Sequence, residues 1–337
     1  MSHRTLIILP DDTIKPILSA ITEARETLRI KMFIFTEPLL INAVIAAFER
    51  GVQVRVMLNP SRGNGAELNL DTRKLLEQAG IEVRDTYPAF KVTHEKSMIK
   101  DGHMAFIQTL NWAPRHLNKT RDYAIITTHQ KEVLEIIDCF ESDWERTEFN
   151  PGETAHLIWC RGNGRARIAR FIDEAKHSLF LQNDRYQDLV IIERLVRAAN
   201  RGVKVHIMSP PPHTLKKDKL VEGIGGLRVM NDVGIKIHNH QHLELHAKML
   251  LADNERAIIG SINLTTGSFD ERRELAIEVE EERIIERLHH TLHEDWKNSY
   301  PLDLSDKGIY KDLENIAEEG SEKLALNFDR KDRKDKK

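Results

Sequence analysis

Four side chains occur twice in this chain, with the same spacing each time. The two sets lie in the segments THEKSMIKDGHMAFIQTLNW and LHAKMLLADNERAIIGSINL, and they are His94, Lys96, Asp101 and Asn111, and His246, Lys248, Asp253 and Asn263. A histidine can act as a nucleophile or as a proton carrier near neutral pH. A lysine two positions further along a strand points to the same face, so its charge can lie beside the imidazole.

Hydrogen-bond donors accompany both sets. Asn111 follows Thr109 by two positions, and Asn263 follows Ser261 by two. Amide and hydroxyl groups are donors suited to anionic oxygens. Two histidines, two lysines and two asparagines suit a phosphodiester, with donors on the non-bridging oxygens and one histidine on each side of phosphorus. No Cys, His and carboxylate cluster has clear metal spacing, so we expect lysines rather than a metal to carry the positive charge, and no cofactor.

Each histidine needs a carboxylate that fixes its tautomer. The candidates are Asp122 and Glu274, which follow Arg121 and Arg273 at matched positions. The alternative for these four residues is ion pairing along an exposed strand.

The motif acids Asp101 and Asp253 fall at expected hairpin turns. We expect them to be structural, bonding to backbone or to a basic partner rather than to substrate.

The motifs belong to a longer internal repeat. His246 lies 152 positions after His94, and the same shift takes Trp144 to Trp296. Upstream the shift is 151, so AFERGVQVRVML (47–58) matches AANRGVKVHIMS (198–209), and Glu37 falls on Asp188. These two acids either cap helices or line a cleft mouth. The repeat predicts domains at 1–150 and 151–302, each with one motif, and a charged tail at 303–337 that is partly helical or disordered.

Strands and helices alternate within each half. In the first half we expect strands in TLIIL, RIKMFIF, VQVRVML, IEVRD and DYAIITT, and helices over 14–27, 39–50, 71–78 and 131–144. KSMIKD and HMAFIQT form a hairpin at Asp101-Gly102, which is a strong turn signal. Strands alternating with helices predict an α/β layered sandwich. The hairpins make its sheets mixed rather than wholly parallel.

Composition bounds the class of protein. The chain has 337 residues, of which 40% are apolar and 31% charged, with a formal net charge of −3. This composition is typical of globular proteins, and it lacks the overall excess of basic residues that many nucleic-acid-binding proteins have. The two cysteines are too few for a disulfide framework. We find no secretory signal and no window of eighteen apolar residues, and we expect a cytoplasmic protein without a transmembrane segment.

The motifs HEKSMIKD with QTLN and HAKMLLAD with GSIN resemble those of the phospholipase D superfamily. The resemblance covers about residues 5–300. It implies two duplicated α/β domains packed about a pseudo-twofold axis, with both motifs in one cleft, and metal-independent phosphodiester chemistry. The family's histidine, lysine and asparagine roles carry over to the matching residues, which are His94, Lys96, Asn111, His246, Lys248 and Asn263.

One position departs from the family pattern. The Gly-Ser pair is kept as Gly260-Ser261, but the first half has Gln108-Thr109. We expect Gln108 to add bulk near the phosphate. By the family's pattern, His94 attacks phosphorus to form a phosphohistidine while His246 carries the proton. The sequence leaves the reverse assignment open.

Three functions fit this sequence. The first is a lipid phosphodiesterase or phosphatidyltransferase, similar to cardiolipin synthases, that reaches its phospholipid peripherally at a membrane surface. The second is a nuclease, for which RHLNKTR (115–121) and the loop 208–219 would supply basic cleft walls. The third is a phosphate-binding scaffold without catalysis. The oligomeric state is not indicated.

Overall fold

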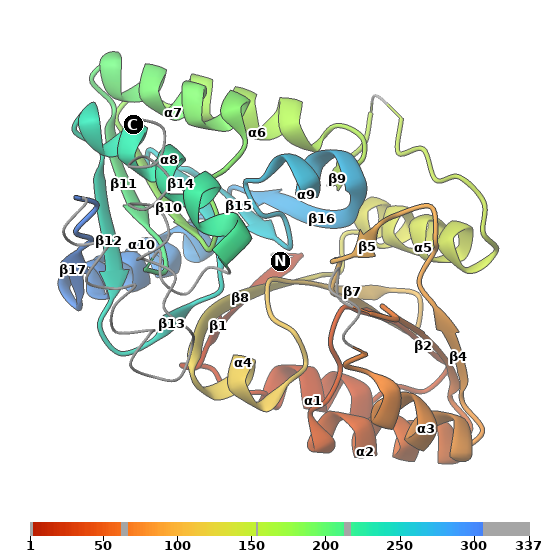
Figure 1. Ribbon diagram of the computed structural model, residues 1–337. Coiled ribbons are helices and arrows are strands. Elements are labelled where there is room, and N and C mark those ends of the chain that lie inside the picture. The colour runs from red at the N-terminus through yellow and green to blue at the C-terminus, as the bar shows by residue number, and fades with distance from the viewer. Residues whose placement is uncertain (1–2, 62–66, 153, 212–216, 306–337) are drawn as a thin grey trace, which may run out of the picture.

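The computed structural model describes residues 3–61, 67–152, 154–211 and 217–305. The predicted tail lies outside these residues from position 306 onward, and so does the centre of the basic loop at 212–216. The remaining chain forms two similar lobes, which we call the first and the second lobe (Figure 1).

The first lobe alternates strands with helices. Its elements are β1 (Arg4–Leu9), α1 (Lys15–Thr22), β2 (Thr27–Met32), α2 (Pro38–Glu49), β3 (Gln53–Leu58), α3 (Leu70–Gln78), β4 (Glu82–Asp85), β5 (Val92–Thr93), β6 (Ser97–Lys100), β7 (Met104–Gln108), α4 (Pro114–Asn118), β8 (Thr120–Thr127) and α5 (Gln130–Trp144).

The second lobe adds one strand at its end and otherwise repeats this order of elements. They are β9 (Ile158–Cys160), α6 (Gly164–Glu174), β10 (Ser178–Asn183), α7 (Leu189–Asn200), β11 (Lys204–Met208), α8 (Lys217–Asp232), β12 (Lys236–His240), β13 (Glu244–Leu245), β14 (Lys248–Ala252), β15 (Arg256–Gly260), α9 (Thr266–Glu271), β16 (Arg272–Val279), α10 (Glu282–Lys297) and β17 (Ser299–Pro301).

Each lobe has one mixed sheet, and the two sheets have the same strand order. The first sheet runs β1-β8-β7-β6-β2-β3-β4, and the second contains the matching series β9-β16-β15-β14-β10-β11-β12. In both, the central strand pairs in parallel on one side (β2 with β3, β10 with β11) and antiparallel on the other (β2 with β6, β10 with β14). The predicted mixed α/β architecture and the duplication are therefore confirmed.

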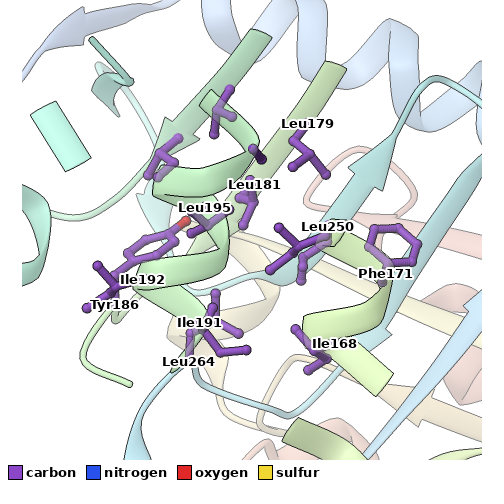
Figure 2. Packing of buried hydrophobic residues seen from close by; sticks show 14 of the residues in the cluster. Ile168, Phe171, Leu179, Leu181, Tyr186, Ile191, Ile192, Leu195, Leu250 and Leu264 are labelled. Carbon is purple, nitrogen blue, oxygen red and sulfur yellow. The ribbon is translucent and has the colours of Figure 1, made fainter. Parts of the chain in front are cut away.

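The two sheets pack against each other across a shared core. This central cluster joins residues of β7 and β8 to residues of β14 and β15, with α5 and α10 covering its flanks. The outer face of the first sheet is covered by α1 and α2, and that of the second by α6 and α7 (Figure 1). In the second lobe Ile168 and Phe171 on α6 and Leu195 on α7 pack over Leu179 and Leu181 of β10 (Figure 2).

The bounds of the predicted strands are close to those in the structure, but the first helix is shorter than predicted. It ends at Thr22 rather than Thr27. The Asp101 carboxylate accepts hydrogen bonds from the backbone N–H groups of Arg25, Glu26 and Thr27, at 2.7 to 3.2 Å. These bonds hold the segment as a turn that leads into β2, so a contact distant in sequence overrides the helical periodicity.

Candidate functional site

One short strand of each lobe pairs with a strand of the other lobe. β5 pairs with β16 of the second lobe, and β13 pairs with β8 of the first. Each strand immediately precedes a motif histidine. The backbone N–H of His94 donates to the carbonyl of Arg273 at 2.9 Å, and that of His246 to the carbonyl of Arg121 at 3.4 Å. Each histidine is thus laid beside the carboxylate that follows the arginine in the opposite lobe.

His94 has two oxygen partners on one ring nitrogen. Its Nδ1 lies 2.9 Å from Glu274 Oε2 and 3.1 Å from the carbonyl oxygen of Ser261. A carbonyl oxygen can only accept, so Nδ1 must carry the hydrogen. In the neutral ring the lone pair is therefore on Nε2, which is the form that a nucleophile requires.

His246 is paired with Asp122 in the same manner. Its Nδ1 lies 2.9 Å from Asp122 Oδ1. The buried carboxylate also accepts hydrogen bonds from the hydroxyls of Thr109 and Thr120. The carboxylates predicted to orient the histidines therefore lie at hydrogen-bonding distance from them, and each histidine draws its carboxylate from the other lobe.

Burial and nearby charge keep both imidazoles neutral. The pKa of His94 lies well below its usual value, mainly through burial and then through the charges of Lys96, Arg272, Lys248 and His246. Burial lowers the pKa of His246 to about 4, although Asp122 opposes this shift. Groups of both motifs act on His94, so the two motifs share one electrostatic environment.

The two carboxylates differ in proton affinity. Burial would raise the pKa of Asp122, but His246 and His116 outweigh it and hold this pKa well below its usual value. The pKa of Glu274 is raised, chiefly by burial. Asp122 therefore stabilises a charged imidazolium on His246 more strongly than Glu274 does on His94.

The two motif lysines are both buried, and each ammonium donates to the carbonyl of its own motif histidine. Their other neighbours differ. Lys96 Nζ lies 5.3 Å from the centre of the Phe33 ring, whereas Lys248 Nζ lies 3.2 Å from Asp184 Oδ1. Burial lowers the pKa of Lys96 to about 7. The Lys248 charge lowers the pKa of Asp184 to about 2, against its desolvation.

Both asparagines and both hydroxyl residues of the motifs are buried. Among the described residues, Oδ1 of Asn111 and Oδ1 of Asn263 have no hydrogen-bond partner. The Thr109 hydroxyl accepts from the Tyr123 N–H at 2.8 Å in addition to its bond to Asp122. The Ser261 hydroxyl accepts from the Leu275 N–H at 3.0 Å. Binding of phosphate by these four residues stays a prediction.

The motif acids lie at the hairpin turns. Asp101 and Asp253 have left-handed φ values of 50° and 54°. Asp253 accepts from the backbone N–H groups of Lys176, His177 and Ser178 at 2.7 to 2.8 Å, as Asp101 does in the first lobe. Each acid ties its hairpin to the start of the neighbouring strand.

Glu37 and Asp188 begin helices α2 and α7. The Glu37 side chain accepts from the Leu39 N–H at 3.3 Å and that of Asp188 from the Ile191 N–H at 3.2 Å. Of the two interpretations of this pair, the structure therefore supports helix capping.

Gln108 does not add its bulk at the cleft. Its side chain is fully buried, and Oε1 accepts from the indole Nε1 of Trp112 at 2.9 Å. Trp112 belongs to the outer core of the first lobe. At the matching Gly260, a Cβ would come within 2.2 Å of the Leu275 carbonyl oxygen, so only the second lobe requires glycine here.

The arginines beside the carboxylates are buried ion pairs between the lobes. Arg121 binds Asp295 at 2.8 Å, and Arg273 binds Asp143 at 2.7 Å. The alternative of surface pairing is therefore wrong. The proposed basic cleft wall at 115–121 is also not supported, because Arg115 is paired with Glu244.

Two groups of side chains in the described ranges have donor atoms within 4.8 Å of one another, as a metal site would require. One comprises Glu95, Cys139 and Asp143, and the ammonium of Lys31 already binds both of its acids, at 3.0 and 2.8 Å. The other comprises His116, Asp122 and His246, in which Asp122 is engaged with His246.

Sequence reasoning missed four groups next to the motifs, namely Phe33, His116, Asp184 and Arg272. Each could have been found from the repeat, by asking where matched positions differ. Phe33 corresponds to Asp184, and His116 to Ser268. A comparison that looks only for identical residues does not find these four, because they lie at positions where the two halves differ.

Known proteins share sequence features with both halves of this chain. The family model described as cardiolipin synthase, phospholipase D-like domain, matches residues 17–144 and 168–296. A polyphosphate kinase of Vibrio parahaemolyticus is 26% identical over 74% of this chain, which spans 37% of that protein. Cardiolipin synthase 1 of Staphylococcus epidermidis is 25% identical over 77% of this chain and 60% of its own length. The chain thus spans less than two thirds of each of these relatives.

The fold also has a counterpart among solved structures. The crystal structure of phosphatidylserine synthase from Haemophilus influenzae has a TM-score of 0.70 and 10% sequence identity, and covers 89% of this chain and 87% of its own. No helix in the described part of the chain has the length and apolarity needed to cross a membrane. With a family model matching both halves and the two-lobed fold in place, the chain belongs to the family of cardiolipin synthase and phospholipase D-like domains.

Proposed function

We propose that the protein is a phosphodiesterase that acts on phospholipids, by head-group hydrolysis or by phosphatidyl transfer, without a metal or cofactor. The observation that carries the proposal is the reciprocal pairing of His94 with Glu274 and His246 with Asp122. Each pair leaves one imidazole Nε2 free of its carboxylate. Two buried lysines supply positive charge beside them. The family relationship to cardiolipin synthases favours a lipid substrate.

The reaction has two displacements. Binding of the anionic phosphate brings His246 to its imidazolium form, with a proton taken up from solvent. Nε2 of His94 attacks phosphorus, the phosphorus–oxygen bond to the leaving group breaks, and His246 donates its Nε2 proton to the departing alkoxide. His246 then removes a proton from water or an alcohol, whose oxygen attacks phosphorus and releases His94. Protons and electron pairs balance, because His246 returns to its starting state.

The surroundings of the two histidines support this order. His94 donates through Nδ1 to a carbonyl oxygen, and burial, followed by the charges of Lys96 and Arg272, lowers its pKa, so its Nε2 lone pair is available. His246 faces the firmly ionised Asp122, which stabilises the imidazolium that a proton carrier must form. The lysines and asparagines would hold the non-bridging oxygens.

The test compares substrate classes with chelator present throughout. Mixed phospholipid vesicles, plasmid and single-stranded DNA, and polyphosphate are offered separately to the purified protein. Head-group release or exchange supports the proposal, and strand scission would support the nuclease alternative instead. Inertness toward all of them would support the scaffold alternative.

Two variants test the residue assignment. His94→Ala should abolish turnover while the circular dichroism spectrum is kept, and full activity in this variant would overturn the assignment. His246→Asn is assayed with a phosphodiester whose p-nitrophenolate leaving group departs without a proton, so that only the second displacement should be slowed. A substrate-derived phosphoryl adduct should then be found on the His94 peptide by mass spectrometry, and an adduct on another peptide would refute the proposed order.

A further inference from the structure

The lobes differ at one position that touches both a candidate phosphate ligand and a candidate catalytic pair. His116 lies on α4, and the matching residue on α9 is Ser268. The imidazole of His116 packs edge-on against that of His246, with 4.2 Å between the ring centres. In the described part of the chain, a third imidazole therefore joins the two motif histidines, and it lies beside His246.

The contacts of His116 determine which of its ring nitrogens carries the hydrogen in the neutral form. Nδ2 of Asn111 lies 3.3 Å from Nε2 of His116. An amide nitrogen donates, so Nε2 accepts and the hydrogen of the neutral ring is on Nδ1. That Nδ1 lies 3.6 Å from Asp122 Oδ2 and has no hydrogen-bond partner within the described residues. His116 thus stands between the Asn111 amide and the Asp122 carboxylate.

In the second lobe the matching group is the Ser268 hydroxyl, which opposes the rise that burial causes in the pKa of Glu274 but carries no ring. The Ser268 N–H and hydroxyl are bonded to the Thr265 side chain, both at 3.2 Å. The basic group close to the Glu274 carboxylate is instead Arg272, at 3.9 Å. The Asp122 side of the site is therefore the side on which a second imidazole shares the carboxylate with a motif histidine.

We propose that His116 is a positioning residue, which orients the Asn111 amide and shares the Asp122 carboxylate with His246, and thereby sets the proton affinity of His246. The proposal deepens the proposed function and rests on it for its catalytic consequence. Its structural part, the coupling of His116 to His246, can be measured without any substrate.

The sign of the coupling follows from the charges that face His246. Asp122 favours its protonation, as does Asp184, whereas Lys248, His94 and His116 oppose it. His116 also contributes to the low pKa of Asp122. Removing His116 takes away one opposing group and leaves the whole carboxylate to His246, so the pKa of His246 should rise.

The experiment replaces His116 by the residue of the other lobe. In His116→Ser, NMR titration of the imidazole signals should show the pKa of His246 rising by about half a unit or more, with that of His94 unchanged. Because the Asn111 amide also loses its partner, turnover of phospholipid should fall about 10- to 100-fold even though the proton-donating form of His246 is favoured. His103→Ser, the same exchange at an exposed hairpin turn, should change neither quantity.

The variant His116→Asn provides a second, independent test. Its amide nitrogen can take the place of Nδ1 opposite Asp122, so it should restore part of the lost turnover and return the pKa of His246 toward the wild-type value. If His116→Ser does not fold, His116→Ala takes its place in the same comparison. An unchanged His246 pKa in folded His116→Ser, or in His116→Ala where that variant replaces it, would overturn the proposal. A shifted pKa in a protein inactive on every substrate would instead overturn the proposed function alone.

Discussion

The two motif lysines show how equal residues acquire unequal properties. Lys96 lies against Phe33 and Lys248 against Asp184, although the lysines occupy matched positions. A buried ammonium without a close carboxylate loses its proton more readily. The ring of Phe33 also packs 4.9 Å from that of His94. The first motif is therefore the less polar of the two, which suits a neutral nucleophile.

This difference predicts the pH dependence of substrate binding. Lys96 must be protonated to bind an anionic phosphate, and its pKa in the free protein is about 7. We expect kcat/KM to fall as the pH rises through this value. Phe33→Asp places a carboxylate there, as the second lobe does, and should move this basic limb upward by about one unit.

The reciprocal variant provides the control. Asp184 raises the pKa of Lys96, so Asp184→Asn should move the same limb to lower pH. The measurement is kcat/KM between pH 5 and pH 9 for the three proteins, on a substrate that does not titrate in this range. A limb that stays in place in both variants would show that Lys96 does not control it.

The carboxylates that orient the histidines give a second prediction. Glu274→Gln keeps the size of the side chain but removes its charge, so the His94 tautomer is held less firmly. We expect kcat to fall about 10- to 100-fold, with a smaller change in KM. Steady-state kinetics with a folding control decides this, and a kcat within twofold of the wild type would show that the Ser261 carbonyl alone orients His94.

The residues of the site were largely predictable from the sequence, whereas their contacts were not. Repetition at a fixed shift indicated the histidines and the carboxylates Asp122 and Glu274. It could not indicate that each carboxylate serves the histidine of the other half, because that depends on packing between lobes. Gln108 illustrates the same limit, since its side chain binds Trp112 in the core instead of meeting the cleft.

At the scale of elements, the short cross-lobe strands β5 and β13 place the histidines. Each is two residues long, so neither can show an alternating pattern in the sequence. The longer strands and the hairpin at Asp101 were predicted from alternation and turn residues. The crossing strands were missed because backbone pairing with another lobe, rather than local composition, defines them.

Buried ion pairs next to these strands predict a large effect on stability. Arg121→Met removes the partner of Asp295 and a donor to the Leu9 carbonyl, leaving a buried carboxylate poorly compensated. We expect the free energy of unfolding to be about 3–5 kcal/mol lower than that of the wild type, as is found when one member of a buried ion pair is lost. Denaturant unfolding followed by circular dichroism measures the difference.

The exposed pair Arg115–Glu244 is the matched control, because it also joins the two lobes. These side chains are 66% and 49% exposed. Arg115→Met should therefore change the free energy of unfolding by at most about 1 kcal/mol. Equal losses in the two variants would mean that burial does not decide the contribution of these interlobe pairs.

At the scale of the whole molecule, one chain supplies both halves of the site. The central core combines side chains of both sheets, so each lobe alone would leave apolar side chains of this core exposed to solvent. The electrostatic coupling of His94 to His246 and Lys248 arises within this single chain. A second copy is therefore not needed to bring the two motifs together.

This arrangement predicts the behaviour of mixed variants. His94→Ala lacks the proposed nucleophile and His246→Asn lacks the proton carrier, so each should be inactive alone. If one chain holds the whole site, mixing the two purified proteins in equal amounts restores nothing, even after joint unfolding and refolding, because every molecule still lacks one histidine. If sites form between copies, some mixed pairs would contain one intact histidine of each kind, and refolding together would recover a substantial fraction of the wild-type rate. The assay is phospholipid turnover before and after co-refolding, with wild-type protein carried through the same procedure to give the recoverable activity.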